Sequence, residues 1–380
     1  MLSVVINIIL LLWLGVPVVY FTVFAFAGVL ERNKAAQEGK GSRSYVILVP
    51  AYKSDCCILD TARAAASQDY PSDRFRVLVI SDSMRPETVA ALKNLPVEVL
   101  EVSFENSTKA ASLKCAMDFL GADAADAVVI LDADNIVGPR FLSGIDGSFR
   151  AETALQAHRT AKNRDTAVAV IDAASEEINN TIFRKGHNAL GLSSALIGSG
   201  MVFDYGWFLR NISSFNTAGE DKEMELRLLR DGIRVEYAGG VEVLDEKTRT
   251  QSNYYSQRRR WTASQYNLMR DALKDFSSVK DKAGYADKLL QWTFPPRMII
   301  IVAVPFLAIL FSLLHSGFGR IWWIMTALLV TSLVVAVPKE QRDRRLLSSF
   351  VKLPVLAAMS VANLFRMKGT KDRFIHTEHE

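Results

Sequence analysis

The chain has 380 residues, 49% of them hydrophobic, which leaves room for one large catalytic domain and membrane segments. Its formal net charge of +4 is too small to indicate a nucleic-acid-binding protein. The three cysteines, Cys56, Cys57 and Cys115, give neither a disulfide framework nor the spacing of a metal site.

The first segment in chain order is apolar. Residues 1–30 contain no charged side chain, and a bilayer span needs roughly 20 apolar residues. A secretory signal peptide would begin with basic residues and have a shorter apolar stretch. We therefore expect residues 1–30 to form a retained transmembrane helix.

Strand-like and helix-like patterns alternate after Ser44. Apolar runs predict strands at 45–49, 75–80, 97–102 and 127–131, and helical spacing predicts helices at 58–67 and 110–120. Continuous apolar runs suit strands that are buried on both faces of a parallel sheet, with helices as crossovers. The alternation predicts a doubly wound, Rossmann-like α/β domain.

An aromatic residue and three carboxylates follow the ends of these predicted strands. The residues at the strand ends are Pro50, Ala51, Tyr52, Asp82, Asp132 and Asp134. Ligands of open α/β sheets bind outside the carboxyl ends of the strands. The chain has no glycine-rich phosphate loop, so phosphates would be held through a divalent cation on the carboxylates, and Mg²⁺ or Mn²⁺ suits oxygen ligands. Alone, an Asp-x-Asp pair is more often a turn or a helix cap, but here it follows an apolar strand.

Residues 222–230, followed by Gly232, have helical spacing and are preceded by Glu220 and Asp221. Two interpretations of this acidic pair are open. The carboxylates can simply stabilise the N-terminus of the helix, or one of them can act as a general base.

A second helical segment carries Gln257, Arg260 and Trp261, whose spacing places them on one face. We expect Arg258 and Arg259 to point elsewhere, toward lipid headgroups. The alternative is a basic amphipathic surface helix near the membrane. We expect the polar segment 158–163 to be a solvated loop, with contact to the donor or acceptor as the alternative, and we assign no role to His187.

The sequence is apolar again near the C-terminal end. Residues 298–338 predict a transmembrane helical hairpin, and residues 271–297 connect it to the domain. Basic residues flank the predicted spans: Arg32, Lys34, Lys40, Arg43, Lys339, Arg342, Arg344 and Arg345. The positive-inside rule places these flanks, and the domain between them, in the cytoplasm. Residues 346–366 are interrupted by Lys352 and Pro354, and a span there would carry four basic residues outside. We expect an interfacial helix, with a fourth span as the alternative, followed by a cytoplasmic tail at 367–380.

Taken together, the ordered motifs resemble the family 2 glycosyltransferases of GT-A fold. The most similar members are membrane-bound: cellulose, chitin and hyaluronan synthases and ceramide glucosyltransferase. The resemblance covers about residues 44–270. Its strongest element is the Q-x-x-R-W match at 257–261, and the Asp-x-Asp pair and the Gly-Glu-Asp sequence at 219–221 support it.

The resemblance implies roles for the residues at the strand ends. Pro50, Ala51, Tyr52 and Asp82 would hold the base of the nucleotide, usually uracil, although the family commonly has two acidic residues where this chain has only Asp82. Lys109 would also contact the nucleotide. Asp132 and Asp134 would bind Mg²⁺ or Mn²⁺, with Asp132 also touching the nucleotide.

On the acceptor side, the resemblance makes Asp221 the general base. Arg260 would contact the diphosphate, and Trp261 would face the sugar. The further donor- or acceptor-binding residues implied are Gly198, Ser199, Gly200, Glu220 and Gln257.

The predicted function is inverting transfer of a sugar from a nucleotide sugar, a UDP-sugar by resemblance, to a glycan or lipid acceptor at the bilayer, in polysaccharide or glycolipid synthesis. The small number of spans favours a single transfer to a lipid, or a synthase that secretes with an export partner. A non-catalytic membrane scaffold is the remote alternative, and the intact set of motifs argues against it.

The tail offers one more match. Phe374, Thr377 and His379 loosely resemble the F-x-V-T-x-K gating loop of cellulose and hyaluronan synthases. The gating interpretation would place this segment over the bound nucleotide, whereas the alternative is a disordered polar terminus.

Overall fold

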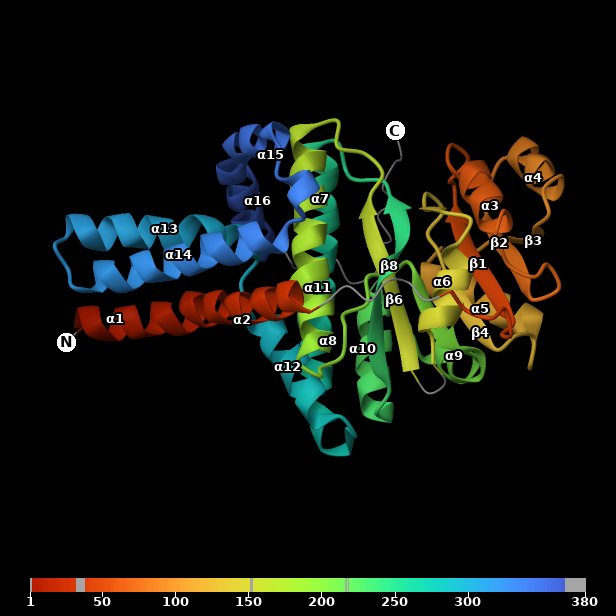
Figure 1. Ribbon diagram of the computed structural model, residues 1–380, viewed down its shortest axis with the longest axis horizontal. Helices are drawn as coiled ribbons and strands as arrows, with labels where there is room; N and C mark the ends of the chain where they lie inside the picture. Colours follow the sequence, from red (N-terminus) through yellow and green to blue (C-terminus); the bar gives the residue numbers. More distant parts are fainter. Residues whose placement is uncertain (1, 32–37, 151–152, 216, 218, 366–380) are drawn as a thin grey trace.

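The computed structural model describes residues 2–31, 38–150, 153–215, 217 and 219–365. Arg32, Lys34 and the predicted gating residues Phe374, Thr377 and His379 lie outside these ranges. The molecule is elongated (Figure 1), with a bundle of long apolar helices at one end and a β-sheet with its flanking helices at the other.

One sheet of eight strands forms the core of the domain, in the order β3-β2-β1-β4-β7-β6-β8-β5. The strands are β1 (Tyr45–Tyr52), β2 (Phe75–Asp82), β3 (Glu98–Val102), β4 (Ala127–Ile130), β5 (Ile136–Val137), β6 (Thr153–Ala161), β7 (Met201–Asp204) and β8 (Arg234–Asp245). β1 to β4 are parallel, whereas β7 is antiparallel to both β4 and β6, and β5 is antiparallel to β8. The predicted α/β class is confirmed. The predicted parallel sheet is found for the first four strands, whereas the rest of the sheet is mixed.

The parallel half is buried on both faces. Successive side chains of β1 enter different hydrophobic cores, because neighbouring residues of a strand point to opposite sides. Tyr45, Ile47 and Val49 pack with α3 (Ile58–Ala66) and α6 (Phe141–Ser148). Val46 and Leu48 pack with α5 (Lys109–Leu120) and α9 (Tyr205–Asn211). This two-sided burial fixes the carboxyl ends of β1, β2 and β4 at one edge of the sheet.

Long helices separate the sheet from the apolar bundle. In Figure 1, α7 (Ala167–Asn179) and α11 (Gln251–Lys274) run across the direction of the bundle. The other helices outside the bundle are α4 (Pro86–Lys93), α8 (His187–Ala189), α10 (Glu220–Asp231), α12 (Lys282–Thr293), α15 (Arg344–Ser349) and α16 (Leu353–Phe365). α7 continues through a π-helical turn at 180–186 into α8.

The bundle contains α1 (Leu2–Leu10), a π-helical turn at 11–15, α2 (Val16–Leu30), α13 (Arg297–Leu313) and α14 (Phe318–Ala336). Within the described residues, three helices are long and apolar enough to cross a membrane: Val4–Leu30, Phe318–Ala336 and Arg344–Asn363. The pair α12 and α13, bent by 63°, could form a fourth. Large apolar side chains stand exposed on the bundle, among them Leu12 at 64% and Phe306 at 60%, which suits contact with lipid.

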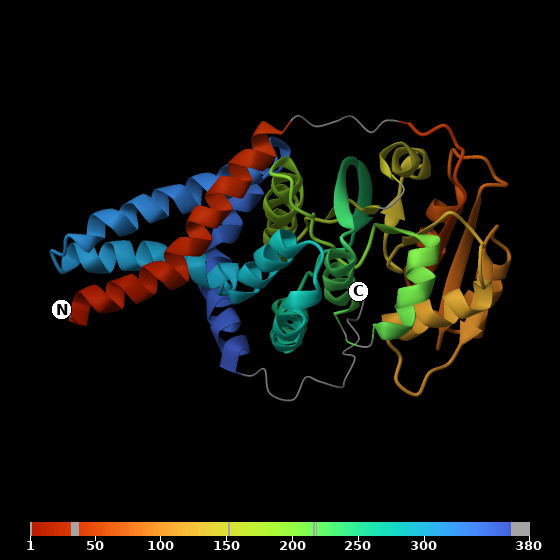
Figure 2. The ribbon, with the colours of Figure 1, turned by 90° about the horizontal axis from the view of Figure 1, so that it is seen from below.

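The last candidate span differs in direction from the bundle. In Figures 1 and 2, α16 runs across α13 and α14, and it packs against α11 and α13. A helix in this direction would lie along the surface of a bilayer whose normal follows the bundle. The arrangement is therefore compatible with the interfacial helix predicted for 346–366.

The expectation of a solvated loop at 158–163 is wrong over its first four residues. His158 to Ala161 belong to β6, which pairs with β8, and Arg159 is buried. The polar sequence led to the wrong prediction because the end of this strand carries ion-paired side chains, His158 with Glu177 and Arg159 with Glu176. The three cysteines are free thiols, with Cys56 exposed and Cys57 buried.

Candidate active site

A cleft of about 320 Å³ opens at the carboxyl ends of β1, β2 and β4. It is lined by most of the residues predicted for the site: Pro50, Ala51, Tyr52, Asp82, Lys109, Asp132, Asp134, Gly198, Glu220, Asp221, Gln257 and Trp261. Ser199 and Gly200 are buried next to it. The side chain of Arg260 lies outside the described part of the structure.

Asp82 closes one end of the cleft, where it stands in register with Tyr52 of β1. The carboxylate is fully buried, and its Oδ1 accepts a hydrogen bond of 2.9 Å from Ser83 Oγ. Within the described residues, Oδ2 has no hydrogen-bond partner. A buried acceptor of this kind is costly to leave unsatisfied, so Oδ2 is suited to an N–H donor of a ligand.

Lys109 stands at the start of α5, whose N-terminus is capped by Thr108 Oγ1 accepting from the Ala111 amide at 3.1 Å. Its Nζ donates to the carbonyl of Gly198 at 2.6 Å and contacts Asp132. Burial alone would lower the pKa of Lys109, but Asp132 and Glu220 outweigh it and raise that pKa. Gly198 has φ +84°, a left-handed conformation that glycine adopts without strain.

The Asp132–Asp134 pair lies in the turn after β4. The Asp132 amide donates to Asn135 Oδ1 at 3.0 Å and to Ser199 Oγ at 3.2 Å, which fixes the turn. Burial and the nearby carboxylates Asp245 and Asp132 raise the pKa of Asp134. A cation between such carboxylates would offset their repulsion.

The donor set fits a hard divalent cation. The described residues contain no group of three or more His, Cys, Asp or Glu side chains that could hold a metal ion. Two carboxylates completed by phosphate oxygens of a substrate are a common coordination for Mg²⁺, and Mn²⁺ accepts the same ligands. Asp132 and Asp134 therefore match what a nucleotide-bound cation requires.

Sequence reasoning missed a charged group beside the Asp132–Asp134 turn. Asp245, at the end of β8, accepts from Lys247 Nζ at 2.8 Å and from Asn135 Nδ2 at 3.2 Å, and Arg159 lies 3.5 Å away. Asp245, Lys247 and Arg159 all line the cleft. The available signal was the apolar alternation before Asp245, which marks a strand end much as the run before Asp132 does.

Glu220 and Asp221 form the first turn of α10 and face the cleft. Burial and the neighbouring Asp221 raise the pKa of Glu220, although Lys109 opposes them. Asp221 Oδ1 accepts a hydrogen bond of 2.9 Å from the Lys222 amide. Such a bond orients the carboxylate while its other oxygen can accept a proton.

Helix α11 supplies the last part of the site. Its N-terminus is capped by Thr250 Oγ1, which accepts from the Asn253 amide at 3.3 Å. Gln257 and Trp261, one turn apart, both line the cleft, as their spacing predicted.

The expectation that Arg258 points toward lipid headgroups is wrong. Its Nη2 donates to Asp172 Oδ1 at 2.8 Å. The guanidinium lies 4.9 Å from the ring centre of Tyr254 and 4.8 Å from that of Trp261, a cation–π arrangement. Asp172 is remote from Arg258 in the sequence, and Tyr254 belongs to none of the recognised motifs. The local pattern therefore gave no indication of these partners.

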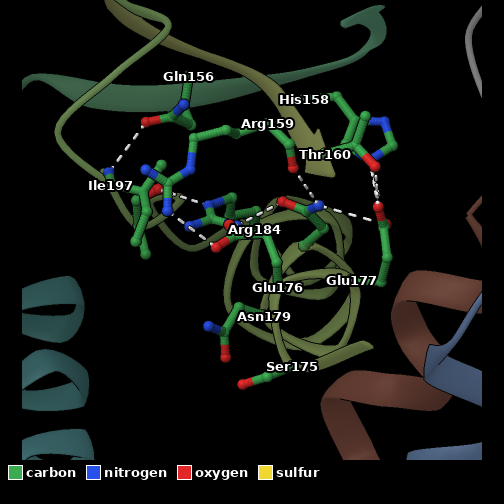
Figure 3. A network of polar contacts seen from close by, with 12 residues as sticks. Gln156, His158, Arg159, Thr160, Ser175, Glu176, Glu177, Asn179, Arg184 and Ile197 are labelled. Carbon is green, nitrogen blue, oxygen red and sulfur yellow. Dashed lines mark hydrogen bonds and ion pairs between the residues drawn. The ribbon is translucent and has the colours of Figure 1, made fainter. Parts of the chain in front are cut away.

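A buried ion-pair network supports the wall formed by β6 (Figure 3). Glu176 of α7 contacts Arg159 at 3.0 Å and Arg184 at 2.9 Å. Burial tends to raise the pKa of Glu176, but Arg159, Lys247 and Arg184 hold that pKa well below its ordinary value. The network ties the sheet to the helices that face the bundle.

A second cavity of about 280 Å³ lies beyond Trp261. It shares Ile197, Lys222 and Trp261 with the cleft. Its other walls come from α7, α11 and α12 and from the candidate membrane helices α2, α13 and α16. The two spaces are therefore neighbours, one at the sheet edge and one at the bundle.

Comparison with known proteins gives a consistent result. The family model described as "Glycosyltransferase like family 2" matches residues 42–264. The mannosyltransferase PcManGT from Pyrobaculum calidifontis, solved in complex with GDP-Man and Mn²⁺, is 17% identical with a TM-score of 0.57, covering 88% of this chain and 98% of that one. S. aureus TarS 1–349 is 16% identical with a TM-score of 0.44, covering 86% and 90%. No significant sequence match to a curated protein was found.

Proposed function

The chain belongs to glycosyltransferase family 2 and has the GT-A fold, and from this we propose that it transfers a single sugar from a nucleotide sugar to a lipid acceptor at the membrane. One observation carries the proposal. Asp132, Asp134 and Asp221 line a single cleft whose wall, Trp261, also lines a cavity bounded by the candidate membrane helices.

The donor would bind along the carboxyl ends of the parallel strands. Asp82 Oδ2, which lacks a partner among the described residues, would accept an N–H of the base. Uracil meets this requirement and is the base that the resemblance implies. Lys109, held charged beside Asp132, would lie near the diphosphate.

Asp132 and Asp134 would hold the divalent cation. When bound, the cation supplies positive charge that stabilises the diphosphate as a leaving group. The Mn²⁺ and GDP-Man present in the PcManGT structure support this assignment by analogy of fold.

Asp221 would act as the general base. Its carboxylate would take the proton of the acceptor hydroxyl as that oxygen forms a bond to the anomeric carbon. The bond from the anomeric carbon to the diphosphate breaks on the opposite side, so the product has inverted configuration. Trp261 would present its ring to the sugar, which keeps the reacting carbon between donor and acceptor.

The membrane helices would place this chemistry at the cytoplasmic face. Lys40 and Arg43 follow the first candidate span, and Lys339 and Arg342 follow α14. The positive-inside rule favours the cytoplasmic side for both flanks. The second cavity lies between these helices and the cleft, an arrangement that favours a lipid acceptor over a growing polymer.

The direct test supplies the purified protein in lipid nanodiscs with individual UDP- and GDP-sugars and measures release of the nucleoside diphosphate. We expect release from one donor in Mn²⁺ or Mg²⁺, loss of release in EDTA, and recovery when the metal is restored. Absence of release from every donor, with a cell-membrane lipid extract present, would contradict the proposal.

A further inference from the structure

The second cavity, beyond Trp261, contains more positive than negative charge. Three of its cations are matched by carboxylates. Lys288 Nζ donates to Glu225 Oε1 at 2.9 Å, with both side chains 6% exposed, and Arg184 pairs with Glu176. Arg258 pairs with Asp172 at 2.8 Å.

Arg297 differs from these three. Its guanidinium donates to Asn179 Oδ1 at 2.9 Å and to the carbonyl of Ser175 at 3.0 Å. In the described part of the chain no carboxylate pairs with it. Arg297 is half-buried, and a partly desolvated guanidinium that is held only by neutral acceptors is suited to an anion that completes its surroundings.

Arg258 and Arg297 converge on one point. Both donate to Ser175 Oγ, Arg258 at 3.5 Å. Figure 3 shows Ser175 and Asn179 on α7 pointing away from the network around Glu176, and Glu176 makes no direct ion pair with Arg297 in the described structure. Among the described residues, the buried Nε of Arg258 also lacks a hydrogen-bond partner. Two planar guanidinium groups at one place form the kind of site that binds a phosphate.

Part of the remaining wall is apolar and lies toward the membrane helices. This part includes Phe21 of α2, Trp292 of α12, Met298 of α13, and Phe294 in the link between α12 and α13. A site with an arginine pair next to an aromatic wall is complementary to a molecule with an anionic head and an apolar tail. A neutral lipid would cover the apolar wall but would leave Arg297 without a counter-ion.

We infer that this cavity binds the phosphate-bearing head group of a membrane lipid, with Arg297 and Arg258 as the phosphate ligands, and that this lipid is the sugar acceptor. The inference rests on the proposed function and specifies its acceptor class. The shared wall explains how the two substrates meet, because Trp261 and Lys222 border both spaces and Lys222 follows the candidate base Asp221. A hydroxyl attached near the lipid phosphate could then reach the cleft.

The experiment measures binding of three probes to the full chain in a neutral detergent by microscale thermophoresis. The probes are dioctanoyl phosphatidylglycerol, dioctanoylglycerol and inorganic phosphate. We expect phosphatidylglycerol to bind more tightly than either other probe, and to inhibit transfer onto a cell-membrane lipid extract competitively. Arg297→Gln should weaken phosphatidylglycerol binding about tenfold, the value of one charge-assisted hydrogen bond, and should leave dioctanoylglycerol binding unchanged.

Two further variants keep the result interpretable. Arg164→Gln is the matched control, because Arg164 pairs with Asp343 at 3.1 Å outside both cavities, and it should bind all probes normally. Arg297→Lys keeps the charge, so it should retain part of the preference for phosphatidylglycerol. If Arg297→Gln does not fold, the affinity of Arg297→Lys for phosphatidylglycerol shows whether Arg297 binds the phosphate. Retained nucleotide binding shows that a variant is folded.

Several results would overturn the inference. Equal binding of phosphatidylglycerol and dioctanoylglycerol to the unmodified chain would mean that the phosphate is not recognised. Tighter binding of inorganic phosphate would indicate a soluble anion instead of a lipid. Normal phosphatidylglycerol binding by Arg297→Gln would exclude Arg297. In each case release of nucleoside diphosphate by the unmodified chain shows that the proposed function itself still holds.

Discussion

The two spaces that meet at Trp261 differ in charge, and we propose that they bind phosphates in opposite ways. The cleft at the sheet edge presents carboxylates, among them Asp132, Asp134 and Asp221. The cavity at the bundle presents arginines, Arg258 and Arg297. A diphosphate that enters a carboxylate-rich cleft gains from a cation between them, whereas a lipid phosphate can bind arginines directly. We therefore expect nucleotide binding to depend on the metal and lipid binding to be independent of it.

The largest expected effect separates chemistry from binding. Asp221→Asn keeps the size of the side chain but removes the proton acceptor, so transfer should fall by about a thousandfold, within the usual range for a general base. Nucleotide and lipid-probe affinities should stay nearly unchanged, because neither phosphate site includes Asp221. Initial rates with saturating donor give the measurement.

Asp60→Asn is the control for that substitution. Asp60 is an exposed carboxylate of α3 that pairs with Arg63 at 2.9 Å and does not line the cleft. It should retain full activity. Near-normal turnover by Asp221→Asn would remove Asp221 from the base role and point to Glu220 instead.

The second largest expected effect shows which of the two spaces needs a metal ion to bind its ligand. Asp134→Ala should weaken nucleotide binding in Mn²⁺ by about a hundredfold, corresponding to the loss of one strong charged ligand. Dioctanoyl phosphatidylglycerol should bind this variant as it binds the unmodified chain. Calorimetric titrations with and without EDTA measure both quantities. Unchanged nucleotide affinity in the variant would contradict the metal assignment.

Removal of the shared wall should have a smaller effect. Trp261→Ala should lower transfer about tenfold, because an aromatic ring contributes on the order of 1 kcal/mol beyond simple burial, while nucleotide affinity changes little. Trp323, which is exposed on α14, provides the matched Trp323→Ala control. Equal losses of transfer and nucleotide binding in Trp261→Ala would indicate a packing role.

The smallest expected effect concerns the tail, for which the gating interpretation stays a prediction. Deletion of residues 374–380 should lower transfer on the order of threefold, about the value of one weak hydrogen bond. Lipid-probe binding and recovery of the protein in the membrane fraction should not change. A rate equal to that of the full chain would favour the disordered alternative.

The sequence predicted the cleft better than the cavity, and the reason is physical. Residues of the cleft follow the ends of short apolar strands, so local patterns locate Asp82, Asp132 and Asp134, and the structure brings them together. The cavity combines residues from Phe21 to Asn363, which no local pattern connects.

The same distinction explains the errors. Arg159 was expected in a loop and Arg258 at the lipid surface, because each arginine was judged without its partner. Their carboxylates, Glu176 and Asp172, both come from α7. Buried charges depend on such distant partners, so their places follow from the tertiary fold and cannot be derived from neighbouring residues.

The most direct test of the account follows the sugar itself. Nanodiscs made from a cell-membrane lipid extract and containing the protein are incubated with the donor that supports nucleoside diphosphate release, radiolabelled in its sugar, and the lipids are then extracted and separated by charge. The account predicts Mn²⁺-dependent label in one anionic lipid fraction, absent with Asp221→Asn. Label found only as free sugar, in a neutral lipid or in material that organic solvent does not extract would contradict it.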